Sequence, residues 1–171
     1  MKYPFGKPIF DNKQYINSIK KIFKSGKLVH GINIENFEND FKAFTKANDA
    51  ISVSSCTTGM QLFYNVLNIS SGDEVIVSSQ THVATAHAIE SCGAKPIFVD
   101  SELETGNINI DKIEKKINRK TKAITVVHYL GNPVDMIKIN KIAKKHKLFV
   151  LEDCALALGT TINKKHVGLF G

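Results

Sequence analysis

From residue 50 onward, short β-rich runs alternate with longer helical patterns, and this alternation constrains the fold more than any other feature of the sequence. The runs that favour strands are Ala50–Ser54, Glu74–Val77, Pro96–Val99, Ala123–His128 and Phe149–Glu152. The segments between them with helical spacing of apolar residues are Thr57–Leu67, Ala84–Ser91, Asp111–Ile117 and Met136–His146. Strands that alternate with helices are typical of βαβ units and a parallel sheet. The sequence therefore predicts an α/β fold.

The first 48 residues have a different pattern. Apolar residues recur at helical spacing between Asp11 and Lys24 and again between Ile34 and Thr45, and Gly26 is a suitable helix stop. We therefore expect an N-terminal helical segment over residues 1–48 and the α/β region over residues 49–171.

Composition excludes several classes of protein. With 171 residues, 43% of them hydrophobic and 23% charged, the chain can bury a core and is not typical of a disordered protein. Its longest apolar runs fall far short of the ~20 residues that a membrane span needs, and its start lacks the pattern of a signal peptide. Three cysteines without a CxxC pair suit a reducing compartment, so we expect a cytoplasmic protein.

The net charge of +7 raises the question of a nucleic-acid partner. Arg119 is the only arginine, although arginine is the residue that best recognises phosphate and guanine. The lysines are scattered over the expected helix faces. This pattern favours solvated surfaces over a nucleic-acid site.

Ligands of parallel α/β sheets bind at the carboxyl ends of the strands, where this sequence carries polar residues. Ser54-Ser55-Cys56-Thr57-Thr58 leads from a predicted strand into a predicted helix. Small hydroxyl residues at a helix start offer N–H groups, hydroxyls and a positive dipole end, which together bind phosphate. The alternative is a plain Ser/Thr helix cap. The chain contains neither GxGxxG nor a Walker loop, so a dinucleotide or nucleoside-triphosphate site is not expected.

Two further strand ends carry candidate ligand contacts. His82 could be a base, a metal ligand or a flat ring stacked on a ligand, or simply a polar loop residue. Its spacing of five from His87, and of five again to Cys92, argues against a metal site. Asp153 follows an apolar strand and would need a cationic partner there, such as a protonated ring nitrogen. The alternative is that Asp153 caps a helix and Glu152 is exposed.

Taken together, these segments resemble one family. A phosphate cup, a flat side chain and a buried acid, in this order, are what a pyridoxal-phosphate site requires. From Gly26 to Gly171 the chain resembles the DegT/DnrJ/StrS nucleotide-sugar aminotransferases, which are fold-type-I pyridoxal-phosphate enzymes. The matching motifs include Ser55-Cys56-Thr57, Gly72-Asp73-Glu74-Val75-Ile76-Val77, Thr81-His82-Val83-Ala84-Thr85, Gly131-Asn132-Pro133-Val134-Asp135-Met136 and Glu152-Asp153-Cys154-Ala155-Leu156-Ala157.

The resemblance implies a fold and a set of site residues. The fold is a three-layer α/β/α arrangement around a mostly parallel sheet, the incomplete large domain of such an enzyme. Cys56 and Thr57 would bind the cofactor phosphate, His82 would stack on the pyridine ring, and Asp153 would pair with its nitrogen. Leu156 departs from the family, in which many members carry a His or Gln able to bond the ring hydroxyl.

The resemblance also implies an activity. The enzyme would transfer an amino group from glutamate to a keto sugar linked to a nucleotide, as in polysaccharide and lipopolysaccharide biosynthesis, and would act as a homodimer. One alternative is a pyridoxal-phosphate sugar dehydratase of the same family, and another is a lysine-less pseudo-enzyme that acts as a binding partner.

By the same resemblance, the catalytic Schiff-base lysine lies beyond Gly171. Residues 49–171 would then be the N-terminal part of the cofactor-binding domain, with no catalytic residue of their own. We therefore expect this chain to be inactive by itself.

Overall fold

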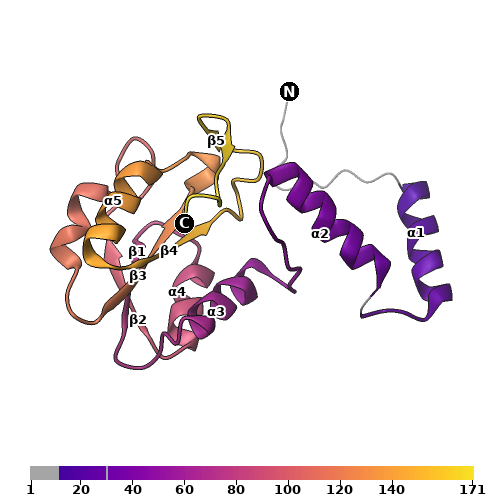
Figure 1. Cartoon of the computed structure of the whole chain (residues 1–171), viewed down its shortest axis with the longest axis horizontal. Coiled ribbons are helices and arrows are strands. Elements are labelled where there is room, and N and C mark those ends of the chain that lie inside the picture. The colour runs from indigo at the N-terminus through magenta and orange to yellow at the C-terminus, as the bar shows by residue number, and fades with distance from the viewer. Residues whose placement is uncertain (1–11, 30) are drawn as a thin grey trace. The chain divides into compact units, whose positions relative to one another are not determined.

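The computed structural model describes residues 12–29 and 31–171 (Figure 1). The chain divides into two compact units. The smaller unit extends to Phe44 and also takes in Asn48–Ser52, and the larger unit comprises Thr45–Ala47 and Val53–Gly171.

The smaller unit is built on two helices, α1 (Asn12–Ser25) and α2 (Ile32–Thr45). Both were predicted, although the expected start of the first at Asp11 lies outside the described residues. The predicted stop is confirmed, because Gly26 follows α1 with a φ of +67°. After α2, the N–H and hydroxyl of Ser52 both donate to the Glu38 carboxylate, at 2.7 and 2.8 Å. These bonds lower the pKa of Glu38.

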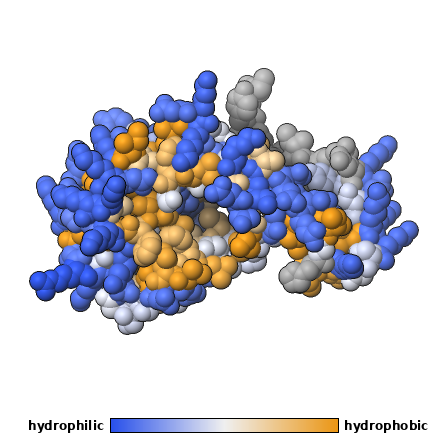
Figure 2. All heavy atoms as spheres, in the orientation of Figure 1, coloured by the Kyte–Doolittle hydropathy of each residue, from blue (hydrophilic) through white to orange (hydrophobic). Residues whose placement is uncertain are grey.

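The apolar faces of the two helices remain largely exposed in the described unit. Phe23 is 67% exposed on α1, and Phe37 and Phe44 are 59% and 61% exposed on α2. Figure 2 shows hydrophobic atoms at the molecular surface among hydrophilic ones. These helices are amphipathic, as predicted, but they bury little of their apolar surface.

The larger unit is organised around a four-stranded parallel sheet. Its strands are β1 (Glu74–Ser78), β2 (Lys95–Val99), β3 (Thr121–Val127) and β4 (Phe149–Asp153), in the order β2-β1-β3-β4. β3 and β4 end side by side, because Val127 is paired with Asp153. The prediction of a parallel α/β sheet is therefore confirmed.

Alternate residues of the strands build a separate core on each face of the sheet. Val75 and Val77 belong to a cluster with Met60, Tyr64 and Ile89, which come from α3 (Cys56–Val66) and α4 (Val83–Ser91). The intervening Ile76 belongs to a second cluster. That cluster contains Met136, Ile139 and Ala143 of α5 (Met136–His146). Helices thus cover both faces, and the predicted three-layer α/β/α fold is confirmed.

The predicted strand at Ala50–Ser54 is wrong, because none of these residues belongs to a strand. Ile51 is 83% exposed and Val53 39% exposed. A β-rich sequence becomes a strand only where another strand offers backbone groups to pair with, and no described strand pairs with this run.

The predicted helix at Asp111–Ile117 is also wrong. The segment forms two short 3₁₀ helices, η1 (Ile110–Lys112) and η2 (Glu114–Lys116). In a 3₁₀ helix, side chains three residues apart lie above one another. This geometry places Ile110 and Ile113 together against the core, whereas so short an α-helix would lack the length to stabilise itself.

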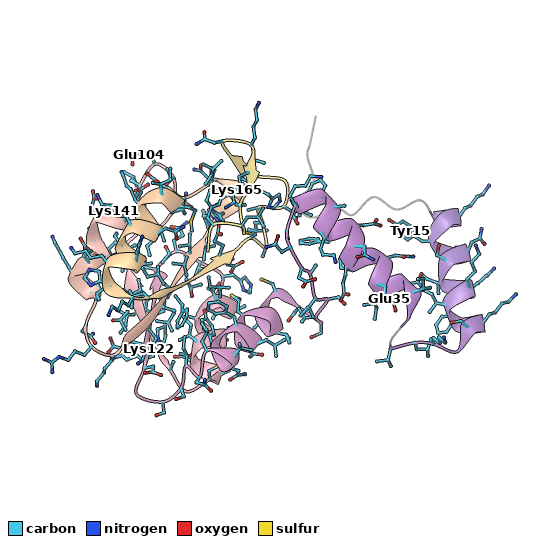
Figure 3. The ribbon with its side chains drawn as sticks, in the orientation of Figure 1. Tyr15, Glu35, Glu104, Lys122, Lys141 and Lys165 are labelled. Atoms are coloured by element: carbon cyan, nitrogen blue, oxygen red, sulfur yellow. The ribbon has the colours of Figure 1, made fainter. Side chains whose placement is uncertain are left out.

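A hairpin near the end of the chain was not predicted. It consists of β5 (Thr161–Ile162) and β6 (Lys165–His166), joined by Asn163 and Lys164. Both of these residues have positive φ, as a tight type I′ turn requires. The Nζ of Lys165, labelled in Figure 3, lies 4.3 Å from the centre of the Phe170 ring.

Among the described helices, none has the length and apolar character needed to cross a bilayer.

Candidate functional site

A cleft of about 300 Å³ opens at the carboxyl ends of β3 and β4. Its walls come from the start of α4, from the end of β3 and the short helix η3 (Tyr129–Gly131) after it, and from the end of β4. The lining residues are Thr81, His82, Val127, His128, Tyr129, Leu130, Asp153, Ala155 and Leu156. Two of the four predicted site residues, His82 and Asp153, therefore line the same cleft.

Asp153 is the last residue of β4 and is 7% exposed. Its Oδ1 accepts from the Cys56 thiol at 3.6 Å and from the Ala155 N–H at 3.1 Å. Its Oδ2 accepts from the hydroxyl of Thr85 at 3.0 Å. All three donors are uncharged, and no cationic side chain forms an ion pair with Asp153 within residues 12–29 and 31–171. A buried carboxylate in this position favours a positively charged ligand in the cleft.

Cys56 is the first residue of α3 and joins this helix to β4. Burial, and then the neighbouring charge of Asp153, raise the pKa of the Cys56 thiol to about 11. The thiol therefore stays protonated at neutral pH and serves as a donor to Asp153. It is not poised as a nucleophile.

The sequence left two roles open for the N-terminus of α3, a plain helix cap and a phosphate site, and the structure shows the cap. Ser55 is the helix cap, because its side chain accepts from the N–H of Thr58 at 3.2 Å. Cys56 and Thr57 follow it in the first turn, where N–H groups have no partner inside the helix. Of these two, Cys56 donates a hydrogen bond to Asp153, and neither Cys56 nor Thr57 is among the residues that line the cleft.

His82 caps α4 and lines the cleft at the same time. Its Nδ1 accepts from the N–H of Ala84 at 3.1 Å, which fixes one edge of the ring to the helix. Nδ1 therefore carries no proton, and Nε2 is the ring nitrogen that can donate. A capped, oriented ring suits the stacking role that the resemblance implies.

Leu156 also lines the cleft and is 65% exposed. It brings an apolar surface to a wall that otherwise includes polar groups. The resemblance implies a His or Gln at this position in many members of the family, whereas the leucine side chain has no atom able to hydrogen-bond a ligand.

Thr85 is a functional candidate that sequence reasoning missed. It is 1% exposed, and because its hydroxyl proton goes to Asp153, its oxygen accepts from Thr81, 2.9 Å away. Thr81, Thr85 and Asp153 thus form a chain of hydrogen bonds that orients the carboxylate. The signal was the spacing of four between Thr81, which precedes the cap of α4, and Thr85 in the first turn, whose hydroxyl oxygens lie 2.9 Å apart.

The side chain of Glu152 is buried, whereas the alternative interpretation of the sequence expected it to be exposed. Its side chain is 2% exposed, and the imidazole of His128 lies 3.0 Å away. Among the described residues, no group of three His, Cys, Asp or Glu side chains is arranged to hold a metal ion.

A parallel sheet with a cleft at its carboxyl end is the architecture of a ligand-binding α/β protein. Sequence comparison gives the family. The chain matches the DegT/DnrJ/EryC1/StrS aminotransferase family over residues 10–171, and it belongs to that family. The family predicted from the motifs is thereby confirmed.

Two curated relatives illustrate the match. The chain is 44% identical over 160 residues to GDP-perosamine synthase of Escherichia coli O157:H7, an alignment that covers 93% of this chain and 43% of the relative. It is 40% identical over 159 residues to dTDP-3-amino-3,6-dideoxy-alpha-D-galactopyranose transaminase of Aneurinibacillus thermoaerophilus, which covers 93% and 44%. The chain thus spans less than half the length of these relatives.

Solved structures agree with the sequence match. An aminotransferase from Psychrobacter cryohalolentis superimposes with a TM-score of 0.90 at 34% identity, over 96% of this chain and 42% of that one. NtdA from Bacillus subtilis, solved with its bound cofactor PMP, gives a TM-score of 0.87 at 32% identity over 92% and 37%. The family is one of pyridoxal-phosphate enzymes, as predicted, and the NtdA structure holds the PMP cofactor.

Proposed function

We propose that this chain forms the cofactor-binding part of a pyridoxal-phosphate-dependent aminotransferase that acts on a nucleotide-linked keto sugar. One observation carries the proposal: the buried carboxylate of Asp153 faces the cleft without a cationic partner in the described part of the chain. A pyridine nitrogen that is protonated would supply the missing positive charge. The names of the relatives, a GDP-perosamine synthase and a dTDP-sugar transaminase, support the sugar-nucleotide substrate.

The residues of the site fit the cofactor in distinct ways. The first turn of α3, with the N–H groups of Cys56 and Thr57, provides positive potential and donors for a phosphate. The ring of His82 offers a flat face at the cleft wall. Asp153 would hold a proton on the pyridine nitrogen, because a nearby negative charge favours the protonated form.

When bound, pyridoxal phosphate supplies a ring that accepts the electron pair released as a substrate C–H bond breaks. This chain's contribution is to keep that ring protonated and oriented. Asp153 provides the charge, and Thr85 and Cys56 fix the direction in which its oxygens point. The three hydrogen bonds to Asp153 come from uncharged donors, so within the described part of the chain its carboxylate has no counter-charge.

Other features of the complete enzyme are part of the same proposal. We take glutamate as the amino donor, a homodimer as the assembly, and the cytoplasm as the location, to which the free thiols of Cys56, Cys92 and Cys154 are suited. The residue that bonds the cofactor covalently would be a lysine outside this chain. The chain alone should therefore bind cofactor but show no turnover with glutamate and a keto-sugar nucleotide, and measurable turnover would contradict this.

The test of cofactor binding uses pyridoxamine 5′-phosphate, which has no aldehyde to react with surface lysines. Titration calorimetry of the chain should detect binding. Asp153→Asn should weaken binding about 10-fold or more, since a charge-assisted hydrogen bond contributes about 1.5–3 kcal/mol. It should also lower the pKa of the ring nitrogen, as followed by absorbance against pH.

The matched control is Asp111→Asn, which removes an exposed carboxylate from η1. This variant should bind like the unaltered chain. If Asp153→Asn bound equally well, with an unchanged absorbance titration, the assignment of Asp153 to the ring nitrogen would be wrong.

A further inference from the structure

The two last residues of β4 are both carboxylates, and they face opposite sides of the sheet. Successive side chains of a strand alternate in direction. Asp153 accordingly contacts Cys56 and Thr85, which belong to α3 and α4. Glu152 instead contacts His128, which follows β3, and the segment Gly168–Gly171.

The carboxylate of Glu152 accepts four hydrogen bonds. Its Oε2 accepts from Nε2 of His128 at 3.0 Å and from the N–H of Gly168 at 2.9 Å. Its Oε1 accepts from the N–H groups of Phe170 and Gly171, at 2.6 and 2.7 Å. Two donors thus converge on each oxygen of a side chain that is 2% exposed.

Which of His128 and Glu152 donates the hydrogen in their bond is decided by the contact that the other ring nitrogen of His128 makes. The N–H of Val134 donates to Nδ1 of His128 at 3.1 Å, so Nδ1 carries no proton. Nε2 must therefore hold the proton and donate it to Glu152. Burial opposes the ionisation of Glu152, but the four N–H donors outweigh it and hold the pKa of the carboxyl below its ordinary value.

Glu152 is connected to the wall of the cleft by its hydrogen bond to His128, which is itself a lining residue. His128 directly precedes η3, and Tyr129 and Leu130 of η3 line the cleft. Leu130 is 68% exposed and has a φ of +51°, a strained conformation for a leucine. Such strain persists only where the surroundings impose it, and here the side chain of Asn107 holds the neighbouring residue, accepting from the N–H of Tyr129 at 3.0 Å.

We propose that Glu152 is a positioning residue of the cofactor cleft. Through His128 it fixes the wall formed by residues 128–131, and through three backbone N–H groups it fixes Gly168–Gly171 beside that wall. The carboxylate is required for its charge and for its two equivalent oxygens. The identity of the ligand in this inference rests on the proposed function.

The decisive variant is Glu152→Gln, which keeps the shape of the side chain. A glutamine has one acceptor oxygen and one NH₂ group. Since two N–H donors converge on each oxygen of Glu152, the NH₂ group faces a pair of donors in either orientation of the amide. His128 cannot relieve the conflict by moving its proton, because its Nδ1 already accepts from Val134.

Amide hydrogen exchange, measured by NMR on the cofactor-free chain, tests whether Glu152 holds residues 128–131 and Gly168–Gly171 in place. Glu152→Gln should accelerate exchange at Val134, Gly168, Phe170 and Gly171 by 10-fold or more. Glu90→Gln, which alters an exposed carboxylate on α4, should leave these amides unchanged. Unchanged exchange in Glu152→Gln would overturn the proposal.

Binding of pyridoxamine 5′-phosphate separates positioning from a merely structural role. Glu152→Gln should lower its affinity about 10-fold while the absorbance titration of the ring nitrogen stays unchanged, because Asp153 keeps its charge. Faster exchange with unaltered affinity would overturn the positioning role. If the unaltered chain bound no pyridoxamine 5′-phosphate, the proposed function would be wrong. Faster exchange in Glu152→Gln would still show that Glu152 holds residues 128–131 and Gly168–Gly171 in place.

A second variant covers the case in which Glu152→Gln does not fold. His128→Asn removes one of the four donors and leaves the carboxylate with its three backbone partners. It should accelerate exchange at residues 129–132 and at Val134 and weaken pyridoxamine 5′-phosphate binding, while Gly168–Gly171 stays protected. Equal exchange and affinity in His128→Asn and the unaltered chain would contradict the proposal.

Discussion

Glu152 and Asp153 are adjacent in the chain, yet the two sides of the sheet use them differently. On the side of α3 and α4, Asp153 accepts hydrogen bonds from a thiol, a hydroxyl and one backbone N–H, and it borders an open cleft. On the other side, Glu152 accepts four N–H donors and is almost completely enclosed. The comparison teaches that the number and kind of donors decide whether a buried carboxylate serves the ligand or the fold.

Glu152→Gln should have the largest effect on stability. The substitution leaves two N–H donors to this enclosed side chain without an acceptor, and because one donor of each pair belongs to an exposed residue, the free energy of unfolding should fall by about 2–3 kcal/mol. Urea denaturation of the chain measures this quantity. Glu90→Gln should change it by less than about 0.5 kcal/mol, as is usual for surface substitutions. A loss as small in Glu152→Gln would show that solvent reaches these N–H groups.

Thr85→Val tests the other side and should have a smaller effect. Valine matches threonine in shape but cannot donate to Asp153, so the expected loss is about 1.5 kcal/mol. The control Thr81→Val removes only the outer bond of the threonine chain and should cost about 0.5 kcal/mol or less. Equal losses of unfolding free energy in the two variants would mean that the bond to Asp153 stabilises the chain no more than the bond between the two threonines.

The acid dependence of stability should also separate the two sides. The folded state lowers the pKa of Glu152 below its ordinary value of 4.5. Its ionised form therefore stabilises the chain above about pH 4.5, and this contribution is lost as the pH falls through the lowered folded value. The difference in unfolding free energy between the unaltered chain and Glu152→Gln should shrink between about pH 6 and pH 3. Parallel curves would contradict the assignment.

The smallest expected effect concerns the reactivity of Cys56. Burial, followed by Asp153, raises the pKa of this thiol to about 11, so its alkylation by iodoacetamide at pH 8 should be slow. Asp153→Asn removes the second of these causes and should accelerate the reaction a few-fold. Mass spectrometry of the labelled peptides follows the rate, with Cys92 as the internal reference. No acceleration would mean that burial alone controls the thiol.

Much of the fold could be predicted because the signals were local. The bounds of α5 agree with the predicted helix Met136–His146, whose N-cap Asp135 and apolar spacing lie within one segment. The four strands of the sheet were each marked by a short apolar run between turn residues. The run at Ala50–Ser54 had the same local signal and failed, because a strand also needs a partner that its own sequence does not specify.

The site was predictable only in outline. The rule that ligands bind at the carboxyl ends of parallel strands singled out His82 and Asp153, and both line the cleft. The roles of Cys56, Thr57, His82 and Asp153 toward the cofactor stay predictions. Thr85 and His128 were missed, because their importance comes from contacts with Asp153 and Glu152 that are 68 and 24 residues away in sequence.

The sequence by itself determined the family, the alternation of strands and helices, and the positions of the polar residues at the strand ends, because each is written in local pattern and motif. The tertiary structure alone decided which of two neighbouring acids faces the cleft. A strand's alternation puts Glu152 and Asp153 on opposite faces, but only the packing of α3, α4 and the segment Gly168–Gly171 shows what each face contains. Hydrogen-bond donors that converge from distant segments, and not the residue type, give each carboxylate its role.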